Sequence, residues 1–194
     1  MPHRAFIGIG TNLGDRLANY HEALERIGKL RHTRIVRQSS IYETEPVGDI
    51  AGPFLNGAVE VETELSAEVL MQQLLSIERA MGRKRVKMPK RARIAKRAKG
   101  AARPKYKPRI IDLDLLFFNK EMIDTPKLTV PHPRLQERRF VLVPMSELAP
   151  ALIHPRLNAS ISELLAGLKS TQRVVLMRAD LLRPPSPRRE VASR

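Results

Sequence analysis

The sequence predicts an α+β sandwich of the ferredoxin-like type, with a mainly antiparallel sheet in a single domain. The chain has 194 residues, 42% of them hydrophobic, which suits one core of ordinary size. Apolar residues recur with period two in some segments and with the period of a helix in others. The order of these segments is strand, helix, strand, strand, helix, strand, which is typical of the ferredoxin-like fold.

The first strand is expected at residues 4–10, RAFIGIG, and a helix follows it. Asp15 can accept hydrogen bonds from the first backbone N–H groups of that helix. The helix itself is indicated by apolar residues at roughly helical spacing, namely Leu17, Leu24, Ile27 and Leu30.

Two middle strands are expected at residues 33–44 and 54–63, and the proline and glycine content of residues 45–53 predicts a loop between them. The second of these strands, FLNGAVEVET, alternates clearly. One of its faces carries Val59 and Val61, and the other carries Ala58, Glu60 and Glu62.

A second helix is expected after Ser66, which can cap its first turn, and Gly82 can end it. The apolar stripe of this helix consists of Leu70, Leu74, Ile77 and Met81. The fourth strand is expected within residues 107–118, KPRIIDLDLLFF.

The rest of the chain is less regular. Residues 121–133 suggest a hairpin and turn, and residues 135–150 suggest a short helix and a strand. We expect the domain to span residues 1–180, followed by a disordered tail at residues 181–194 that has little to bury.

The positive charge of the chain is concentrated in one segment. The formal net charge is +15, and residues 83–109 hold 14 lysines and arginines and no acidic residue. Outside this segment 21 basic and 20 acidic residues remain, so the body is nearly neutral. We expect a mobile basic loop that attracts polyanions such as nucleic acid, anionic lipid or nucleotide phosphates.

Other classes are excluded by composition. The chain has no apolar run of about 18 residues, so no membrane-spanning helix is expected. It has no cysteine, which excludes disulfides and thiolate chemistry. The N-terminal apolar run is too short and too broken for a signal peptide. We expect a cytoplasmic protein that acts as a monomer.

Asp112 and Asp114 are unusual because they interrupt an apolar strand. Alternation places both carboxylates on one face and the neighbouring apolar side chains, Ile111, Leu113 and Leu115, on the other. Two carboxylates this close repel each other, and Mg²⁺ relieves the repulsion while bringing phosphates. The motif alone is equally compatible with two aspartates that face water or pair with nearby arginines.

Nearby arginines favour the metal interpretation. Arg109 precedes the pair, and Arg83 and Arg85 lie at the other end of the basic segment. Carboxylate-bound metal and mobile guanidinium groups are what phosphoryl transfer requires. Most of the other basic residues of the segment are expected to be solvated charges.

A further set of residues suggests a site for a flat heterocycle. Phe54 and Asn56 share one strand face, where an aromatic ring can stack and an amide can bind a ring edge. Arg138 and Phe140 share one side of any extended segment, and His132 follows a proline turn as a candidate phosphate contact. Each of these residues is also compatible with an ordinary core or surface role.

A family resemblance extends from about residue 5 to about residue 155. It is carried by ordered sequence blocks, namely IGIGTNLGDR, SSIYETEPVG, FLNGAV, IERAMGR, PRIIDLDLLFF, LTVPHPRLQERRFVLVP and ELAP. The chain resembles the 6-hydroxymethyl-7,8-dihydropterin pyrophosphokinases of folate biosynthesis. The resemblance implies a ferredoxin-like sandwich, ATP as substrate, two Mg²⁺ ions, and transfer of the β,γ-pyrophosphoryl group to the pterin hydroxymethyl group with release of AMP.

The resemblance also implies roles for individual residues. Asp112 and Asp114 match the metal-binding carboxylates, Asp112 near the attacking hydroxyl, and Arg85 and Arg109 match catalytic arginines. Together with Arg85 and Arg109, the ATP site is matched by Glu78, Arg83, Leu115, Lys127, Thr129, His132 and Arg138. The pterin pocket is matched by Thr44, Val47, Phe54, Asn56 and Phe140, with Asp112 beside it and Tyr106 as an aromatic cover.

The chain departs from the family pattern at several positions. The segment KYKPR stands where the family usually has Arg-Trp-Gly-Pro-Arg, so Tyr106 replaces tryptophan and Lys107 replaces glycine. Glu45 stands where proline is common, and residues 86–104 form a longer, more basic loop. We expect these departures to affect the kinetics of the loop and not the reaction type.

The main alternative is an RNA-binding ferredoxin-like module that uses the basic loop. Aromatic residues make up only 4% of the chain, and the expected strands lack the stacking motif of RNA-binding sheets. RNA binding is therefore expected only as an accessory activity. A membrane-surface protein is disfavoured because no amphipathic apolar face accompanies the basic segment.

Overall fold

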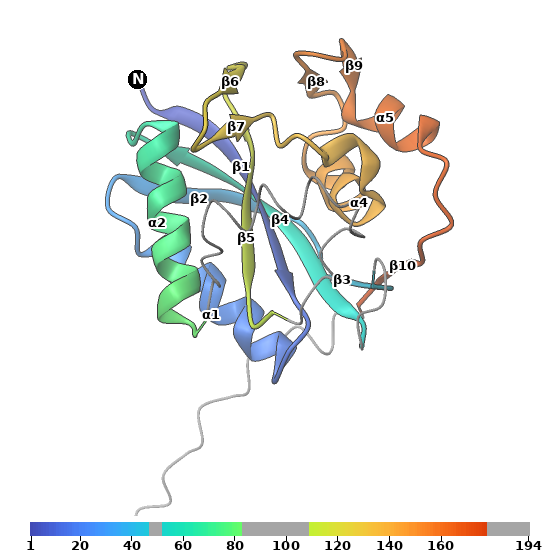
Figure 1. Ribbon diagram of the computed structural model, residues 1–194, viewed down its shortest axis with the longest axis horizontal. Helices are drawn as coiled ribbons and strands as arrows, with labels where there is room; N and C mark the ends of the chain where they lie inside the picture. The colour runs from blue at the N-terminus through green and yellow to red at the C-terminus, as the bar shows by residue number, and fades with distance from the viewer. Residues whose placement is uncertain (47–51, 83–108, 178–194) are drawn as a thin grey trace, which may run out of the picture.

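The computed structural model describes residues 1–46, 52–82 and 109–177. In chain order the helices and strands of this part are β1 (His3–Thr11), α1 (Arg16–Gly28), β2 (Thr33–Gln38), β3 (Tyr42–Thr44), β4 (Phe54–Thr63), α2 (Ala67–Ala80), β5 (Asp112–Phe118), β6 (Ile123–Asp124), β7 (Thr129–Val130), the 3₁₀ helix η1 (Leu135–Glu137), α4 (Arg139–Leu148), β8 (Ile153–His154), β9 (Ala159–Ser160), α5 (Ile161–Gly167) and β10 (Val174–Leu176) (Figure 1). The expected tail at 181–194 lies outside the described residues, as does the basic segment apart from Arg109.

One antiparallel sheet of six strands organises the described part of the chain. Its strands follow the order β10-β3-β4-β1-β5, and β2 also pairs with β4. The hairpins β6-β7 and β8-β9 form separate small sheets. This topology confirms the predicted α+β fold with a mainly antiparallel sheet, and it places β5 at one edge.

The strand expected at residues 33–44 is divided into β2 and β3. The two strands pair with different halves of β4, so that Thr33 lies opposite Thr63 and Thr44 lies opposite Phe54. Between them Ser39 bonds to Ala58 through both its backbone and its side chain. These bonds satisfy polar groups of β4 where the ladder passes from β2 to β3.

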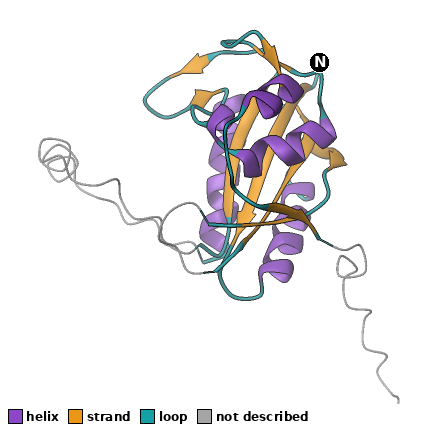
Figure 2. Ribbon diagram, turned by 90° about the vertical axis from the view of Figure 1, so that its right-hand side faces the viewer, coloured by secondary structure: helices purple, strands orange, loops and turns teal. Residues whose placement is uncertain are grey.

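Helices cover both faces of the sheet (Figure 2). Val59 and Val61 of β4 pack in the core beneath α1 and α2, as the alternation predicts, and Ala58 packs in a second core with α4. RNA-binding ferredoxin-like sheets stack bases on exposed aromatic residues of the sheet face. In the described part of this protein α4 covers the equivalent face, which removes support for the RNA-binding alternative.

The predicted helix caps are present. The Asp15 carboxylate accepts a hydrogen bond from the Ala18 N–H at 3.0 Å, and the Ser66 hydroxyl accepts one from the Val69 N–H at 3.4 Å. Gly82 follows α2 with a φ of 89°, a conformation that glycine adopts without strain. Helices α1 and α2 therefore begin where the sequence predicts.

The prediction of a strand within residues 135–150 is wrong, because this segment forms η1 and α4 instead. Val141, Leu142, Met145 and Leu148 are buried, and their spacing gives one face of a helix packed against β4. Pro144 lies inside α4 and lacks the N–H that a helix interior uses. Burial of the apolar face outweighs that loss, so tertiary packing decides the conformation.

No helix in the described ranges is long and apolar enough to cross a membrane.

Candidate active site

A cavity of about 570 Å³ lies on the α4 face of the sheet. Its floor comes from β1, β4 and β5, and its walls come from the end of β3, from the segment between His132 and Val141, and from residues 170–172. Segments far apart in the chain therefore meet around one space, and the sheet register fixes how their side chains are arranged.

Two glycines of β1 form the middle of the floor. Gly10 lies opposite Asn56 of β4 on one side and opposite Asp112 of β5 on the other. Gly8 lies in the same way opposite Asp114 of β5. A Cβ atom at Gly10 would lie 3.0 Å from Asn56 Oδ1. Because Gly8 and Gly10 have no side chains, the floor is open between the part of the cavity formed by β4 and the part formed by β5.

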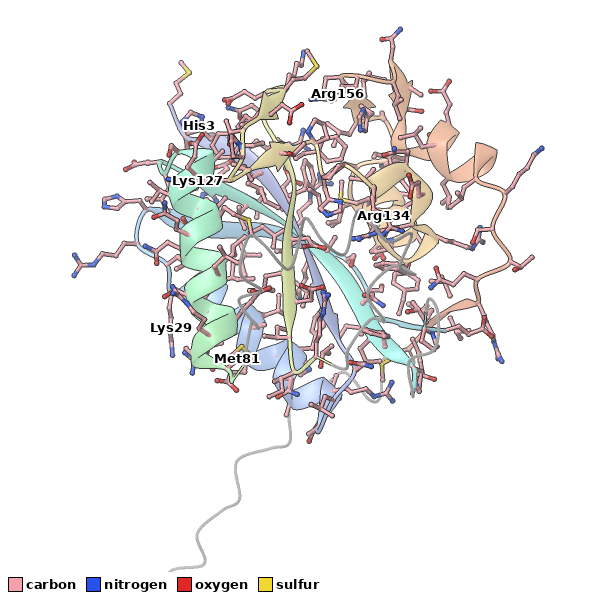
Figure 3. The ribbon with its side chains drawn as sticks, in the orientation of Figure 1. His3, Lys29, Met81, Lys127, Arg134 and Arg156 are labelled. Carbon is pink, nitrogen blue, oxygen red and sulfur yellow. The ribbon has the colours of Figure 1, made fainter. Side chains whose placement is uncertain are left out.

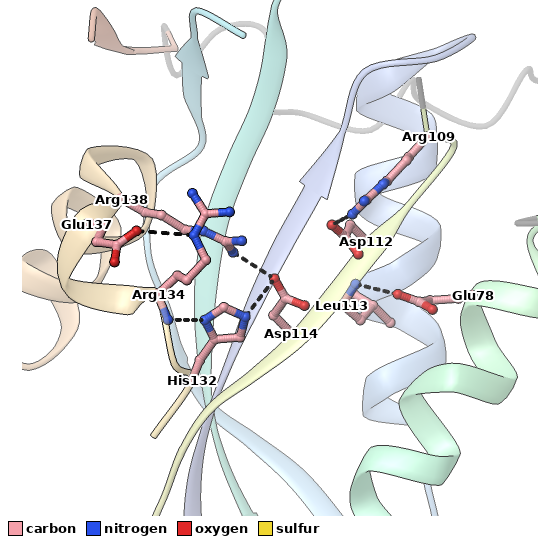
Figure 4. A network of polar contacts seen from close by, with 9 residues as sticks. All are labelled: Glu78, Arg109, Asp112, Leu113, Asp114, His132, Arg134, Glu137 and Arg138. Atoms are coloured by element: carbon pink, nitrogen blue, oxygen red, sulfur yellow. Dashed lines mark hydrogen bonds and ion pairs between the residues drawn. The ribbon is translucent and has the colours of Figure 1, made fainter. Parts of the chain in front are cut away.

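The β5 side of the cavity is charged (Figure 4). Arg109 pairs with Asp112, while Arg138 donates a hydrogen bond to Asp114 at 3.3 Å and His132 Nε2 lies 3.9 Å from the same carboxylate. Alternation thus delivers both aspartates to the cavity, and each has a cationic partner there.

The environment of Asp114 raises the pKa of its carboxyl. Burial is the largest cause, and the negative charge of Asp112 adds to it. The nearby His132, Arg138 and Arg109 oppose the shift without cancelling it. Burial and the neighbouring Asp112 charge therefore disfavour the ionised form of Asp114, and a bound cation would stabilise that form.

His132 is held as a neutral ring with a defined tautomer. Burial lowers the pKa of His132, although Asp114 raises it in part. Its Nδ1 accepts a hydrogen bond from the Arg134 backbone N–H at 3.3 Å, so the ring proton of the neutral form is on Nε2. That N–H faces Asp114 and the cavity, where it can donate to an oxyanion.

The β3–β4 side of the cavity is neutral and aromatic. Asn56 is buried and its amide donates a hydrogen bond to the Thr44 hydroxyl at 2.7 Å. The half-buried rings of Phe54 and Phe140 line the same space. Because Phe140 lies in the first turn of α4, the interpretation of Arg138 and Phe140 as one side of an extended segment is wrong. Both side chains still face the cavity, and the Arg138 Cζ lies 5.6 Å from the Phe140 ring centroid.

The position of α4 over the cavity is fixed by Glu147. This carboxylate accepts hydrogen bonds from the Ser40 N–H at 3.0 Å and from the Tyr42 hydroxyl at 2.8 Å. Burial, followed by the contact with Glu147, raises the pKa of Tyr42 to about 12, so the hydroxyl is a donor at neutral pH. These bonds join the C-terminal part of α4 to β3 and thereby support the Phe140 wall.

Asn12 fixes the backbone of Arg109. Asn12 Oδ1 accepts a hydrogen bond from the Arg109 N–H at 2.7 Å, and the Asn12 N–H donates one to the Arg109 carbonyl at 3.1 Å. The sequence interpretation did not identify Asn12, because its partner lies 97 residues away and the pairing depends on the strand order.

Comparison with known proteins decides the family. The model of the 7,8-dihydro-6-hydroxymethylpterin-pyrophosphokinase (HPPK) family matches residues 6–150. The chain belongs to the HPPK family.

Curated relatives agree with this assignment. The chain is 38% identical over 149 residues to a protein of Bacillus subtilis named 2-amino-4-hydroxy-6-hydroxymethyldihydropteridine pyrophosphokinase, covering 76% of this chain and 79% of that one. It is 33% identical over 169 residues to a Synechocystis protein of the same name, covering 87% of this chain and 78% of that one.

The fold is also similar to a crystal structure of wild-type Plasmodium falciparum HPPK-DHPS with pteroate. The TM-score is 0.60 at 15% identity, and the match covers 86% of this chain and 44% of that chain. This chain therefore spans less than half of the HPPK-DHPS chain. At this identity the likeness concerns the fold alone.

Most of the residues that the HPPK resemblance implies meet in the cavity. Those that line it are Thr44, Phe54, Asn56, Arg109, Asp112, Asp114, His132, Arg138 and Phe140. Those that lie outside the described residues are Val47, Arg83, Arg85 and Tyr106.

Four implied residues do not line the cavity. Glu78 is fully buried in α2, and Leu115 packs in the core beneath α1 and α2. Lys127 and Thr129 belong to the β6–β7 hairpin, and Figure 3 shows Lys127 there, away from Arg134 beside α4. Glu78 instead accepts a hydrogen bond from the Leu113 N–H of the aspartate strand at 2.9 Å.

The structure also adds cavity residues that the sequence did not single out. Arg134 and Glu137 line the cavity and pair with each other at 3.1 Å, a contact that their i,i+3 spacing could have signalled. Gly8 and Gly10, in the IGIG motif, had a signal in their glycine spacing. Residues 170–172 had none, because their position depends on β10 joining the edge of β3.

The carboxylates of this HPPK cavity fit Mg²⁺. No group of three or more His, Cys, Asp or Glu side chains is placed to hold a metal ion in the part of the chain that the structure describes. Mg²⁺ does not require such a cage, because it binds one or two carboxylates together with substrate phosphates and water. Asp112 and Asp114 lie on one strand face and both line the cavity, so they meet that requirement.

Proposed function

We propose that this protein transfers the β,γ-pyrophosphoryl group of ATP to the hydroxymethyl oxygen of 6-hydroxymethyl-7,8-dihydropterin, a step of folate biosynthesis. The products are AMP and the pterin diphosphate. One observation carries the proposal: a single cavity of an HPPK-family chain joins a neutral aromatic side to a charged carboxylate side across the glycines of β1.

The pterin would bind on the β3–β4 side. A flat heterocycle can stack between Phe54 and Phe140 at little cost in ordering, because both rings belong to regular elements of the fold. The Asn56 amide, held by Thr44, can bind a polar ring edge. Val47 and Tyr106 complete this part of the proposal by resemblance.

The triphosphate would bind on the β5 side. Arg109, Arg138 and the His132 Nε2–H are donors of the kind that phosphate oxygens accept. Both arginines contact aspartates in this structure, and we propose that they turn from carboxylate to phosphate oxygens when ATP binds. Arg83, Arg85 and the remaining ATP-site residues of the resemblance are part of the same proposal.

Asp112 and Asp114 would hold Mg²⁺, and we propose two ions. The bound metal supplies charge neutralisation at the phosphate oxygens and thereby favours transfer. A cation held by Asp112 and Asp114 would reduce the repulsion between the two carboxylates and would lower the pKa of Asp114.

In this proposal the reacting centre lies over the glycines of β1. Asp112 lies in the same row as Asn56, with Gly10 between them, so a hydroxymethyl group on a stacked pterin would project toward Asp112. Its oxygen forms a bond to the β-phosphorus while the bond to the α,β-bridging oxygen breaks. AMP leaves with that oxygen, and the hydroxyl proton is released. Catalysis in this proposal consists of positioning and charge neutralisation.

Product analysis tests the proposed reaction. The purified chain should form AMP from ATP and Mg²⁺ when 6-hydroxymethyl-7,8-dihydropterin is present, and should form little without it. AMP formation that is independent of the pterin would contradict the proposal. We also propose a monomeric enzyme, and sedimentation would measure its oligomeric state.

A further inference from the structure

Residues 170–172 form a wall of the cavity that family membership does not account for. Ser170, Thr171 and Gln172 line the cavity together with Thr44, Glu45 and Pro46. The family match ends at residue 150, so this wall lies beyond the matched residues. It belongs to the segment between α5 and β10.

The wall is held in place through Glu45. The Glu45 N–H donates a hydrogen bond to the Arg173 carbonyl at 3.1 Å, which extends the β3–β10 ladder past Thr44. The Gln172 side-chain amide donates to the Glu45 carbonyl at 2.7 Å, and the Glu45 carboxylate accepts from the Arg173 N–H at 3.1 Å. Glu45 is thus bonded through its N–H, its carbonyl and its side chain to one short segment.

This contact lies on the neutral side of the cavity. Glu45 follows Thr44, the residue whose hydroxyl fixes the Asn56 amide. In the sheet, β4 and β1 separate β3 from the aspartates of β5. At about 4.8 Å per strand spacing, the distance from β3 to β5 is roughly 14 Å. A change at Glu45 should therefore alter the heterocycle side and leave the phosphate side as it is.

We propose that Glu45 and Gln172 are positioning residues for the pterin. By bonding to each other they hold residues 170–173 against the end of β3, and this contact fixes the distance between the C-terminal wall and the Thr44–Asn56 pair. The C-terminal segment is then a determinant of affinity for the flat heterocycle. This inference rests on the proposed function, since it takes the pterin as the ligand of the neutral side.

Point variants in the full chain separate this role from a purely structural one. Glu45→Ala removes the carboxylate acceptor, and Gln172→Ala removes the amide donor. Glu45→Gln keeps an acceptor oxygen and serves as the conservative rescue. Lys169→Ala changes an exposed residue of the same segment that does not line the cavity, and it serves as the matched control.

Calorimetry should measure binding of 6-hydroxymethyl-7,8-dihydropterin in the presence of Mg²⁺ and a non-hydrolysable ATP analogue, and binding of that analogue alone. Loss of one such hydrogen bond predicts about a fivefold rise in the pterin Kd for Glu45→Ala and for Gln172→Ala. The Kd of the ATP analogue should change less than about twofold. Glu45→Gln and Lys169→Ala should bind both ligands as the wild type does.

The outcomes distinguish this inference from the proposed function. If the wild type binds the pterin, and Glu45→Ala and Gln172→Ala bind it with the same Kd, the positioning role is overturned and the proposed function is not. Equal weakening of both ligands would also overturn it, since that pattern indicates a general loss of structure. Absence of pterin binding in the wild type would overturn both. Gln172→Ala keeps the result interpretable if Glu45→Ala folds poorly, because it leaves the Glu45 side chain and its bond to the Arg173 N–H in place.

Discussion

The Glu78 carboxylate accepts a hydrogen bond at 2.9 Å from the backbone N–H of Leu113, the residue between the two cavity aspartates. Glu78 is fully buried in α2, and within the described residues β5 lies at the edge of the sheet, with a strand partner on one side only. The helix thus supplies the hydrogen-bond acceptor that a neighbouring strand supplies in the middle of a sheet. Through this bond α2 helps to fix the strand that presents Asp112 and Asp114.

Replacement of Glu78 by alanine should destabilise the protein and lower its activity. A buried N–H that loses its acceptor costs about 1–3 kcal/mol in the free energy of unfolding. Glu78→Gln keeps an acceptor oxygen and should cost less. Urea unfolding of both variants, followed by activity measurements, checks this. Equal stability of the alanine and glutamine variants would show that the hydrogen bond contributes little.

Asn12→Ala should lower kcat by about tenfold while the protein stays folded, because the Arg109 backbone loses one of its two anchors. Asn12→Asp is the control, since it keeps an acceptor oxygen at the same position. Asn12 Nδ2 has no hydrogen-bond partner within the described residues, so this replacement removes no other bond there. If Asn12→Asp lost as much activity as Asn12→Ala, positioning of Arg109 would not be the reason.

Phe140→Ala should weaken pterin binding more than ATP binding. Loss of one stacking face corresponds to about 0.5–1.5 kcal/mol, or up to about a tenfold increase in the pterin Kd. Phe140→Leu keeps apolar volume in the first turn of α4 without the flat ring. Calorimetry with each ligand gives the comparison. A similar loss of affinity for both ligands would assign Phe140 to the α4 core instead.

Glu60 makes stability depend on pH. Burial alone raises the pKa of this carboxyl, but hydrogen bonds and charges from Arg4 and Arg37 outweigh burial and lower the pKa below its usual value. A lowered pKa in the folded state means that the ion pairs stabilise the protein above the pKa of the unfolded chain. This stabilisation is lost as the pH falls through the lower pKa of the folded protein.

Glu60→Gln should therefore be less stable than the wild type at pH 7, by on the order of 1–3 kcal/mol. The difference should shrink as the pH falls below about 4. Denaturant unfolding of both proteins across this range is the measurement. A difference that stays constant with pH would mean that the charge of Glu60 is not what stabilises the fold.

The sequence predicted the parts of the fold that depend on local patterns. The period-two alternation of residues 54–63 correctly assigned Val59 and Val61 to one core and Ala58 to the other face. Asp15 and Ser66 marked helix starts because capping is a local property. The strand expected within residues 135–150 failed, since valines and Pro144 disfavour a helix locally and only packing against β4 overrides them.

The candidate site also combines features that local patterns predict with features that depend on the order of the strands. Alternation alone placed Asp112 and Asp114 on one face, and both line the cavity. The open floor at Gly10, the Asn12 contact and the wall at residues 170–172 all depend on which strands are neighbours. That order is set by pairings between distant segments, such as β1 with β5 and β3 with β10. A single sequence contains no local signal for such pairings.

The most direct test of the central claim follows the β-phosphate. The full chain is incubated with ATP labelled at the β-phosphorus, Mg²⁺ and 6-hydroxymethyl-7,8-dihydropterin, with Asp112→Asn and Asp114→Asn as folded controls. Transfer of an intact pyrophosphoryl group predicts that the label moves to the pterin product in equal amount to the AMP formed, and that both aspartate variants lose roughly a hundredfold or more of this activity. Label that remains in ADP, or transfer that persists in both variants, would contradict the account.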